Sequence, residues 1–412
     1  MSALLIKNIK QLVGINTSTI KRGKMMRELE CINDAWLFME DGVIKDFGDN
    51  TSTFNIQNSK FKIVDASGRL VLPSYCDSHT HLVYAGTREG EFVDRINGLS
   101  YEEIFSRGGG ILNSANRLRE ASEEELFESA WYRLEEIMRM GTGAVEIKSG
   151  YGLSVDSELK MLRIIKRLKE KSPLTIKATF LGAHAVPIEF KNNKSGYIDL
   201  IINEMMPAIA AEKLADYCDI FCEQNYFSYE DTLQFLEAGA KHGMIGKVHA
   251  EQLSHSNGIK AGVESHAISV DHLEFCNDDD IKFLKNSDTI PTILPGAQFF
   301  LSLKNPPARQ MIDAGLPVAI ASDYNPGSSP SGNMNMMMSL ACVNYKMTPE
   351  ECINATTINS AYAMGVHNEL GSIAIGKKAN VFITKEIPSY NFIPYSFANN
   401  LVETVILNGE VL

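Results

Sequence analysis

The sequence predicts an α/β protein in which a (β/α)8 TIM barrel carries a small β-sandwich domain built from both chain ends. Three observations support this prediction. Short apolar runs alternate with amphipathic helical patterns along the middle of the chain, both chain ends have the pattern of antiparallel strands, and polar residues recur where the middle strands end. For the middle region, an open doubly wound sheet is the alternative.

The two ends of the chain are rich in strand and turn signals. Residues 1–66 contain short apolar or alternating runs, and the EDG in AWLFMEDGVIKDFG is typical of a hairpin turn. Residues 371–412 contain similar runs, GSIAIGKKANVFIT and LVETVILNGEVL. Because both ends share a pattern that the middle lacks, we expect residues 1–66 and 371–412 to form one small β domain and residues 67–370 to form the barrel.

The middle of the chain contains eight candidate strands, separated mostly by helical patterns. The helical patterns have charged faces, as in SEEELFESAWYRLEEIMRMG. Apolar strands that alternate with amphipathic helices are typical of a parallel sheet, and eight of them over about 250 residues favour a closed barrel. The candidate strands are RLVLPSY, GAVEIK, TIKATFLG, CDIFC, MIGKVHA, HAISVDH, TIPTIL and PVAIASD.

The composition is that of a globular protein. Of the 412 residues, 44% are hydrophobic and 22% charged, and the net charge is −12. The sequence has no basic block, which argues against binding to nucleic acid or to an anionic membrane surface. No apolar stretch is long enough to span a bilayer, and the N-terminal segment is not typical of a signal peptide. Seven scattered cysteines indicate reduced thiols, so we expect a cytoplasmic protein.

Metal-capable side chains follow five of the candidate strands. In a barrel of this kind, catalytic groups lie at the carboxyl ends of the strands. His79 and His81 are two residues apart, so their side chains point to the same side of an extended chain. With His249 and Asp323 they offer three nitrogens and a carboxylate, a plausible ligand set for zinc or iron(II) that leaves room for water. The residues at strand ends are His79, His81, His184, His249, His272 and Asp323.

Each of these residues also has a structural interpretation. A single strand-end histidine, such as His184 or His272, could be satisfied by a backbone carbonyl, and Asp323 could cap the next helix. The set of metal-capable residues is harder to explain in this way, since the chain contains only nine histidines. The remaining histidines are expected to be structural; they are His242, His255, His266 and His367.

These residues resemble the pattern of the amidohydrolase superfamily, with His-x-His after the first strand, histidines after the fifth and sixth, and aspartate after the eighth. Within it, seven ordered motifs resemble the imidazolonepropionase family, and they run from the first barrel strand to the last. The motifs are DSHTHLVYAGTREGEF, GGGI at 108–111, EIKSGYGL at 146–153, FLGAHA at 180–185, HAEQLS at 249–254, DHLE at 271–274 and ASDYNPGSSP at 321–330.

The resemblance implies metal-dependent hydrolysis of the cyclic amide of 4-imidazolone-5-propanoate to N-formimidoyl-L-glutamate, with one divalent ion, zinc or iron. A bound cation lowers the pKa of its water to about 7 and so supplies hydroxide at neutral pH. Asp323 would be both ligand and proton carrier to the departing ring nitrogen. His272 would orient the water or stabilise the oxyanion, and His184 would hydrogen-bond the ring or its carbonyl.

The substrate also carries a propanoate, and several residues are candidates for binding it. A guanidinium such as that of Arg88 grips a carboxylate with two parallel hydrogen bonds, and Tyr151 can donate a hydroxyl. Structural alternatives are a salt bridge at the rim for Arg88 and packing for Tyr151. The family resemblance makes Gln252 a contact to substrate or water. The donors of a turn-rich loop suit the charged end of the product; they belong to Asn325, Gly327 and Ser328.

Two other functions are weighed against this one. Many ring deaminases of the superfamily carry glutamate three residues after the strand-five histidine, where this chain has Gln252, which cannot carry a proton. The carboxylate of Glu251 falls one position earlier and has no assigned role. A non-catalytic scaffold barrel should lack the metal ligands, which this chain retains.

The expected metal site is mononuclear, and the expected partners are few. Binuclear relatives use a carbamylated lysine after the fourth strand; CDIFCEQN offers none, and Lys148 ends an earlier strand, so we expect one ion. We also expect a small-molecule substrate with a carboxylate and a symmetric homodimer, the commonest oligomer.

Overall fold

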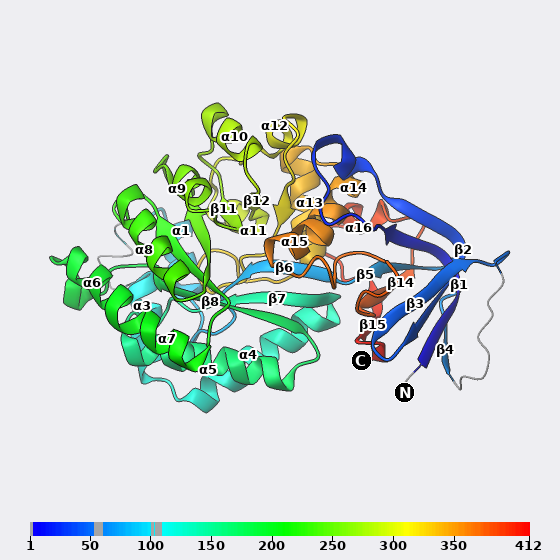
Figure 1. Cartoon of the computed structure of the whole chain (residues 1–412), viewed down its shortest axis with the longest axis horizontal. Coiled ribbons are helices and arrows are strands. Elements are labelled where there is room, and N and C mark those ends of the chain that lie inside the picture. Colours follow the sequence, from blue (N-terminus) through cyan, green and yellow to red (C-terminus); the bar gives the residue numbers. More distant parts are fainter. Residues whose placement is uncertain (1–2, 53–60, 100–102, 104–108) are drawn as a thin grey trace.

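The computed structural model contains two sheets, a parallel barrel and a second sheet built from the chain ends (Figure 1). It describes residues 3–52, 61–99, 103 and 109–412. Gly108, the first residue of the GGGI motif, lies outside the described residues. In the described part of the chain, no helix combines the length and the apolar character that a bilayer span needs.

Eight parallel strands form the barrel, and their order in the sheet follows the sequence. They are β6 (Tyr75–Thr80), β7 (Thr142–Lys148), β8 (Thr175–Ala183), β9 (Tyr217–Cys222), β10 (Ile245–Ala250), β11 (Ser269–His272), β12 (Ile290–Ile293) and β13 (Ala319–Ile320). The chain just after β13 bonds back to β6. The Asp323 N–H donates to the His79 carbonyl at 3.0 Å, and the His81 N–H donates to the Tyr324 carbonyl at 2.9 Å. The first and last strands therefore meet, and the barrel prediction is confirmed.

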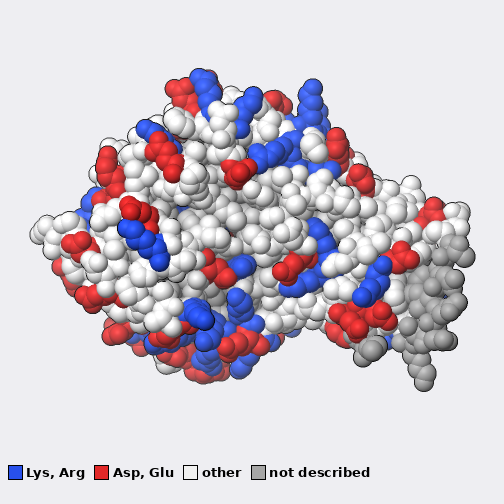
Figure 2. Space-filling model, viewed as in Figure 1, with Lys and Arg blue, Asp and Glu red and all other residues white. Residues whose placement is uncertain are grey.

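Helices surround the barrel and pack apolar faces against its strands (Figure 1). The pattern SEEELFESAWYRLEEIMRMG forms α4, which begins after Ser122 in a capping box with Glu125 and buries Leu134 and Ile137. The helices are α1 (Glu89–Ile96), α3 (Ile111–Glu120), α4 (Glu123–Arg139), α5 (Val155–Lys171), α6 (Lys194–Leu200), α7 (Met206–Glu212), α8 (Tyr229–Lys241), α9 (Gly258–Glu264), α10 (Asp278–Lys285), α11 (Pro295–Phe300), α12 (Ala308–Asp313), α13 (Met334–Tyr345), α14 (Pro349–Thr356), α15 (Ile358–Ala363) and α16 (Phe392–Tyr395), with the short turns η1 (Gly23–Arg27), η2 (Ile188–Phe190) and η3 (Ile201–Met205). On the face shown in Figure 2, side chains of both charges are interspersed.

The second sheet joins the two chain ends beside the barrel (Figure 1). Its strands are β1 (Ala3–Ile15), β2 (Glu30–Glu40), β3 (Val43–Asp49), β4 (Lys62–Asp65), β5 (Arg69–Pro73), β14 (Val381–Glu386), β15 (Val402–Leu407) and β16 (Glu410–Val411). The expected hairpin joins β2 to β3 through Asp41 and Gly42. The sequence predicts a sandwich; in the structure, the strands form one hydrogen-bonded sheet, in which the long β1 pairs with β2, β4 and β5.

The run RLVLPSY is not a single barrel strand as expected from the sequence. It divides at Ser74 into β5, which pairs with β14 in the chain-end sheet, and β6, which pairs with β7 in the barrel. Apart from Arg69, both pieces are buried, so the apolar pattern gives no sign of the change of sheet. We therefore propose that the chain-end domain extends to Pro73, beyond the boundary at residue 66 expected from the sequence.

Candidate active site

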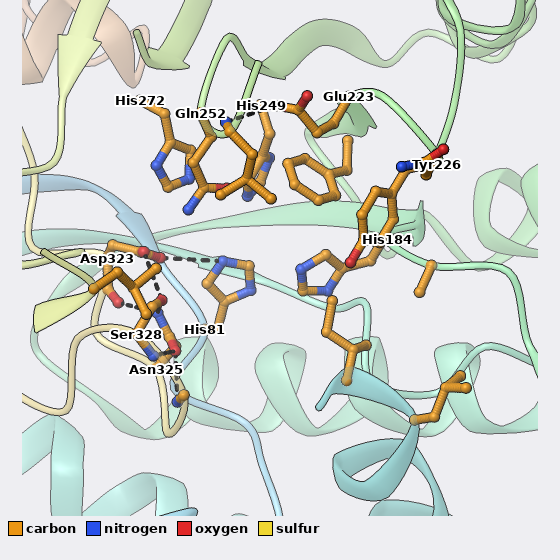
Figure 3. A pocket seen from close by; sticks show the side chains of 18 of the residues that line it. His81, His184, Glu223, Tyr226, His249, Gln252, His272, Asp323, Asn325 and Ser328 are labelled. Atoms are coloured by element: carbon orange, nitrogen blue, oxygen red, sulfur yellow. Dashed lines mark hydrogen bonds and ion pairs between the residues drawn. The ribbon is translucent and has the colours of Figure 1, made fainter. Parts of the chain in front are cut away.

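Four side chains predicted as metal ligands converge at the carboxyl end of the barrel. His79 and His81 lie at the end of β6 and His249 in β10, and ligand atoms of the three lie within 4.8 Å of one another. Asp323, which follows β13, places Oδ1 3.5 Å from Nε2 of His79 and 3.4 Å from Nε2 of His81. All four side chains are buried. Figure 3 shows His81, His249 and Asp323 on the wall of a pocket.

Two of the three imidazoles, those of His79 and His249, are neutral and oriented as a divalent ion requires. Nδ1 of His79 lies 2.6 Å from Oδ2 of Asp271, while its buried Nε2 has no hydrogen-bond partner. Nδ1 of His249 lies 3.0 Å from Oδ2 of Asp219. Burial lowers the pKa of His79, and it lowers the pKa of His249 to about 4, so both rings are neutral at pH 7. A neutral ring with Nδ1 held by a carboxylate presents Nε2 as a ligand, and the residues fit a metal.

His272 lies beside these residues, with its ring centroid 5.3 Å from that of His249. Its Nδ1 is 3.8 Å from Oε1 of Glu274, a buried carboxylate that was not predicted. Burial lowers the pKa of His272, but the negative charges of Glu274, Asp323 and Asp271 outweigh burial and raise it above the usual value. His272 has a φ of 90° and Asp323 a φ of 52°. Such backbone strain in residues other than glycine is concentrated at functional sites.

His184 and Tyr151 form another part of the wall. The ring of His184 stacks on that of His81, with centroids 5.3 Å apart, and the Tyr151 ring lies 5.5 Å from His184. Nδ1 of His184 lies 3.1 Å from the carbonyl of Gly150, whose φ of 108° is accessible mainly to glycine. The backbone partner considered as an alternative therefore exists, but it engages only one ring nitrogen. Since Nδ1 donates to that carbonyl, Nε2 of the neutral ring is a hydrogen-bond acceptor.

A cavity of about 920 Å³ opens above the metal-capable residues, and every residue predicted to contact substrate lines it. Figure 3 shows Gln252, Asn325 and Ser328 around it, with Tyr226 and Glu223 on the far side. The lining includes Arg88, Tyr151, His184, Gln252, Asn325, Gly327 and Ser328, together with Glu91, Glu223, Phe221 and Tyr226, which were not predicted.

The loop after Asp323 binds mainly to itself. The Asn325 side chain donates to the Asp323 carbonyl at 2.6 Å and to Ser328 Oγ at 2.7 Å, and its Oδ1 accepts from the N–H groups of Gly327 at 2.7 Å and Ser328 at 2.8 Å. These donors, expected to face the product, thus hold the loop in shape. Their role in substrate binding stays a prediction.

Arg88 is held at the pocket wall by Glu91. Its Nε and Nη2 donate to Oε2 of Glu91 at 2.9 and 2.6 Å, and Glu91 also accepts from the Gly110 N–H at 3.0 Å. A Cβ at position 327 would lie 2.1 Å from Nη1 of Arg88, so only glycine lets the guanidinium come this close to the loop. The salt bridge considered as an alternative is present, and the guanidinium still lines the cavity.

Comparison with known proteins identifies the family. The amidohydrolase family model matches residues 70–412. The chain is 56% identical over 410 residues to a protein of Flavobacterium johnsoniae named imidazolonepropionase, covering 99% of each chain. It is 54% identical to the imidazolonepropionase of Christiangramia forsetii, covering 99% of this chain and 100% of the relative. The chain belongs to the imidazolonepropionase family.

Three solved structures with the same fold are less similar in sequence to this family member. A triazine hydrolase variant superposes with a TM-score of 0.77 at 14% identity, and the alignment covers 100% of this chain and 94% of the hydrolase chain. An Arthrobacter aurescens atrazine chlorohydrolase mutant, solved with zinc and atraton, has a TM-score of 0.73 at 15% identity (99% and 95% coverage). The E. coli guanine deaminase has a TM-score of 0.76 at 11% identity (100% and 99%). At these identities the likeness shows the fold alone.

Some residues that shape this family member's site were missed from the sequence. Glu251, left without a role, accepts from the N–H groups of Gly258 at 2.8 Å and Ile259 at 2.9 Å and so holds the first turn of α9. Glu223 accepts from the Leu253 N–H at 2.8 Å and fixes the loop that carries Gln252. In the sequence, each of these glutamates directly follows a barrel strand, and this position marks them as candidates for the site. The position alone does not show which groups they bind.

Proposed function

We propose that this protein hydrolyses the cyclic amide of 4-imidazolone-5-propanoate to N-formimidoyl-L-glutamate. The main support is the convergence of His79, His81, His249 and Asp323 in a chain that is 56% identical, over nearly its full length, to a protein named imidazolonepropionase. A ring amide is a poor electrophile and water a poor nucleophile, so the reaction needs both an activated water and a carrier for its proton.

His79, His81, His249 and Asp323 would hold one divalent ion, zinc or iron. When bound, it lowers the pKa of water to about 7 and polarises the carbonyl under attack. A second ion of the carbamylated-lysine type has no place on Lys148, whose Nζ is already 2.6 Å from Glu146 and 2.7 Å from Asp219.

Asp323 and His272 handle protons and charge in this mechanism. Burial alone raises the pKa of Asp323, but the neighbouring rings of His81 and His272 lower it below the usual value, so Asp323 is a carboxylate at pH 7. It takes the proton of the attacking water and passes it to the departing ring nitrogen. His272, on the same wall, stabilises the negative charge that develops on the carbonyl oxygen.

The other wall orients the substrate. Nε2 of His184 accepts a ring N–H, since Nδ1 already donates to Gly150. The guanidinium of Arg88, fixed by Glu91, binds the propanoate, and Tyr151 donates its hydroxyl to the substrate. Gln252 and the loop of Asn325, Gly327 and Ser328 complete the contacts.

The test is turnover by the purified, metal-loaded protein. Imidazolonepropanoate made in place by urocanase should lose its absorbance, and guanine and cytosine analogues should release no ammonia. Ammonia release without loss of imidazolone absorbance would overturn the proposal in favour of a deaminase. Inactivity on both, in protein that holds its metal, would favour the scaffold.

The assembly and location stay predictions. We propose a homodimer in the cytoplasm that acts on a small carboxylate-bearing molecule and binds neither nucleic acid nor membrane. Sedimentation velocity measures the first point, and a monomer at micromolar concentration would contradict it.

A further inference from the structure

Five charged side chains lie inside the barrel, directly beneath the metal-capable histidines. Each has an exposed fraction of 0%. They come from four strands, β7, β9, β10 and β11, and we call them the buried charge cluster: Glu146, Lys148, Asp219, Lys247 and Asp271. Burying so many charges is costly unless each is paired, so their arrangement calls for a functional explanation.

Lys148 is the centre of the buried charge cluster. Its Nζ lies 2.6 Å from Oε1 of Glu146, 2.7 Å from Oδ2 of Asp219 and 3.8 Å from Oδ2 of Asp271. One ammonium thus contacts or approaches all three carboxylates.

Lys247 supports the cluster from the other side. It donates to the carbonyl of Ser78 at 2.9 Å and to Oε2 of Glu146, and its Nζ lies 3.9 Å from Oδ2 of Asp271. Two ammonium groups therefore stand among three carboxylates, a net charge of −1 when all five are ionised.

The same carboxylate oxygens that face the lysines also face the metal-capable rings. Oδ2 of Asp219 lies 3.0 Å from Nδ1 of His249, and Oδ1 accepts the His249 backbone N–H at 3.2 Å. Oδ2 of Asp271 lies 2.6 Å from Nδ1 of His79, and Oδ1 accepts from Ser269 Oγ at 2.7 Å. Two of the three imidazoles are thus connected to one lysine through one aspartate each.

We propose that Lys148, assisted by Lys247, is a positioning residue of the metal site. It holds Asp219 and Asp271 in the place where they fix the rings of His249 and His79, with Nε2 of each turned to the ion. This inference rests on the proposed metal-dependent function. Partners behind metal-bound histidines typically change metal affinity by about 10- to 100-fold when removed.

Loss of the ammonium would disturb both aspartates at once. Among the residues that the structure describes, Asp219 would keep no lysine or arginine in direct contact without Lys148, and Asp271 would keep only Lys247, at 3.9 Å. A buried carboxylate without its counter-charge moves or draws in water, and the ring that it orients is released. Metal affinity should therefore fall although no ligand has been changed.

The experiment measures zinc affinity of the full-length, zinc-loaded protein by competition with a chromophoric chelator. Lys148→Met removes the charge and keeps most of the length of the side chain; we expect zinc affinity to fall about 10-fold or more. The matched control is Lys377→Met. Lys377 is also a buried lysine, but its Nζ donates to the backbone carbonyls of His367 and Leu370 and not to a partner of the metal-capable histidines, so zinc affinity should not change.

The outcomes separate this inference from the proposed function. Failure of the wild-type protein to hold zinc or iron would overturn the metal-dependent function itself. Wild-type zinc affinity in folded Lys148→Met would overturn the positioning role alone.

If Lys148→Met does not fold, the isosteric Asp219→Asn and Asp271→Asn variants replace it, and unchanged zinc affinity in both would overturn the inference. In folded protein, the double variant Lys148→Met with Asp219→Asn should lose less zinc-binding free energy than the sum of the losses of the two single variants, because both substitutions act through His249.

Discussion

The barrel and the chain-end sheet both bury many side chains, but they bury side chains of different chemical character. The chain-end sheet buries mainly apolar side chains, such as Leu4, Ile6 and Ile406 in its main cluster. The mouth of the barrel buries histidines, aspartates, lysines and glutamates at the same depth. The first arrangement stabilises by removing apolar surface from water, and the second needs every charge to have a partner.

From this difference we expect substitutions in the two regions to affect different properties of the protein. A change in the chain-end sheet should alter the free energy of unfolding and leave catalysis intact. A change at the barrel mouth should alter metal binding or turnover. Four substitutions test that separation, from the largest expected effect to the smallest.

His249→Ala should remove metal and activity together, with turnover falling on the order of 10³-fold or more, because the nucleophile depends on the ion. Metal content and turnover are measured on the same sample. The control is His255→Ala, since His255 pairs with Asp280 away from the site and should keep its metal. Full activity of metal-free His249→Ala would contradict the assignment.

Asp323→Asn should lower kcat by about 10²- to 10⁴-fold while part of the metal stays bound, since an amide cannot accept the proton of the water. Metal analysis and steady-state kinetics distinguish the two effects. Near-normal kcat would exclude Asp323 as the proton carrier.

Ile6→Ala should lower the free energy of unfolding by about 2–5 kcal/mol, because Ile6 is fully buried in the apolar cluster of the chain-end sheet. Denaturant titration measures the loss, and kcat and KM should stay at wild-type values. A change in KM at a temperature where the variant is folded would show that the two interiors are coupled.

Arg88→Ala should raise KM about 10- to 100-fold with little change in kcat, since a charged hydrogen-bond pair contributes about 1.5–3 kcal/mol of binding. Arg69→Ala is the control, because Arg69 forms its ion pairs with Glu403 and Glu386 in the chain-end sheet. An unchanged KM for Arg88→Ala would exclude its role in gripping the propanoate.

Several parts of the site follow from the sequence because barrel topology makes strand ends meet. His79, His249 and Asp323 are far apart in the chain, yet each follows or ends a parallel strand, so each must reach the same mouth. The two-residue spacing of His79 and His81 adds that both point to one side. For Arg88 the sequence suggested a salt bridge as an alternative but did not identify Glu91 as the partner, since Arg88 lies just before helix α1 and its side chain has no fixed direction there.

By itself, the sequence determined the alternation of strands and helices and the residues that stand at the strand ends, because hydrophobic periodicity and local turn chemistry act over a few residues. Only the tertiary structure decided that β5 leaves the barrel and that Lys247 meets Glu146, 101 residues away in the chain. It also showed that the Asn325 side chain forms hydrogen bonds with backbone groups of its own loop. Such choices depend on strand register and on which charges share one small buried volume, and neither quantity is encoded in a local pattern.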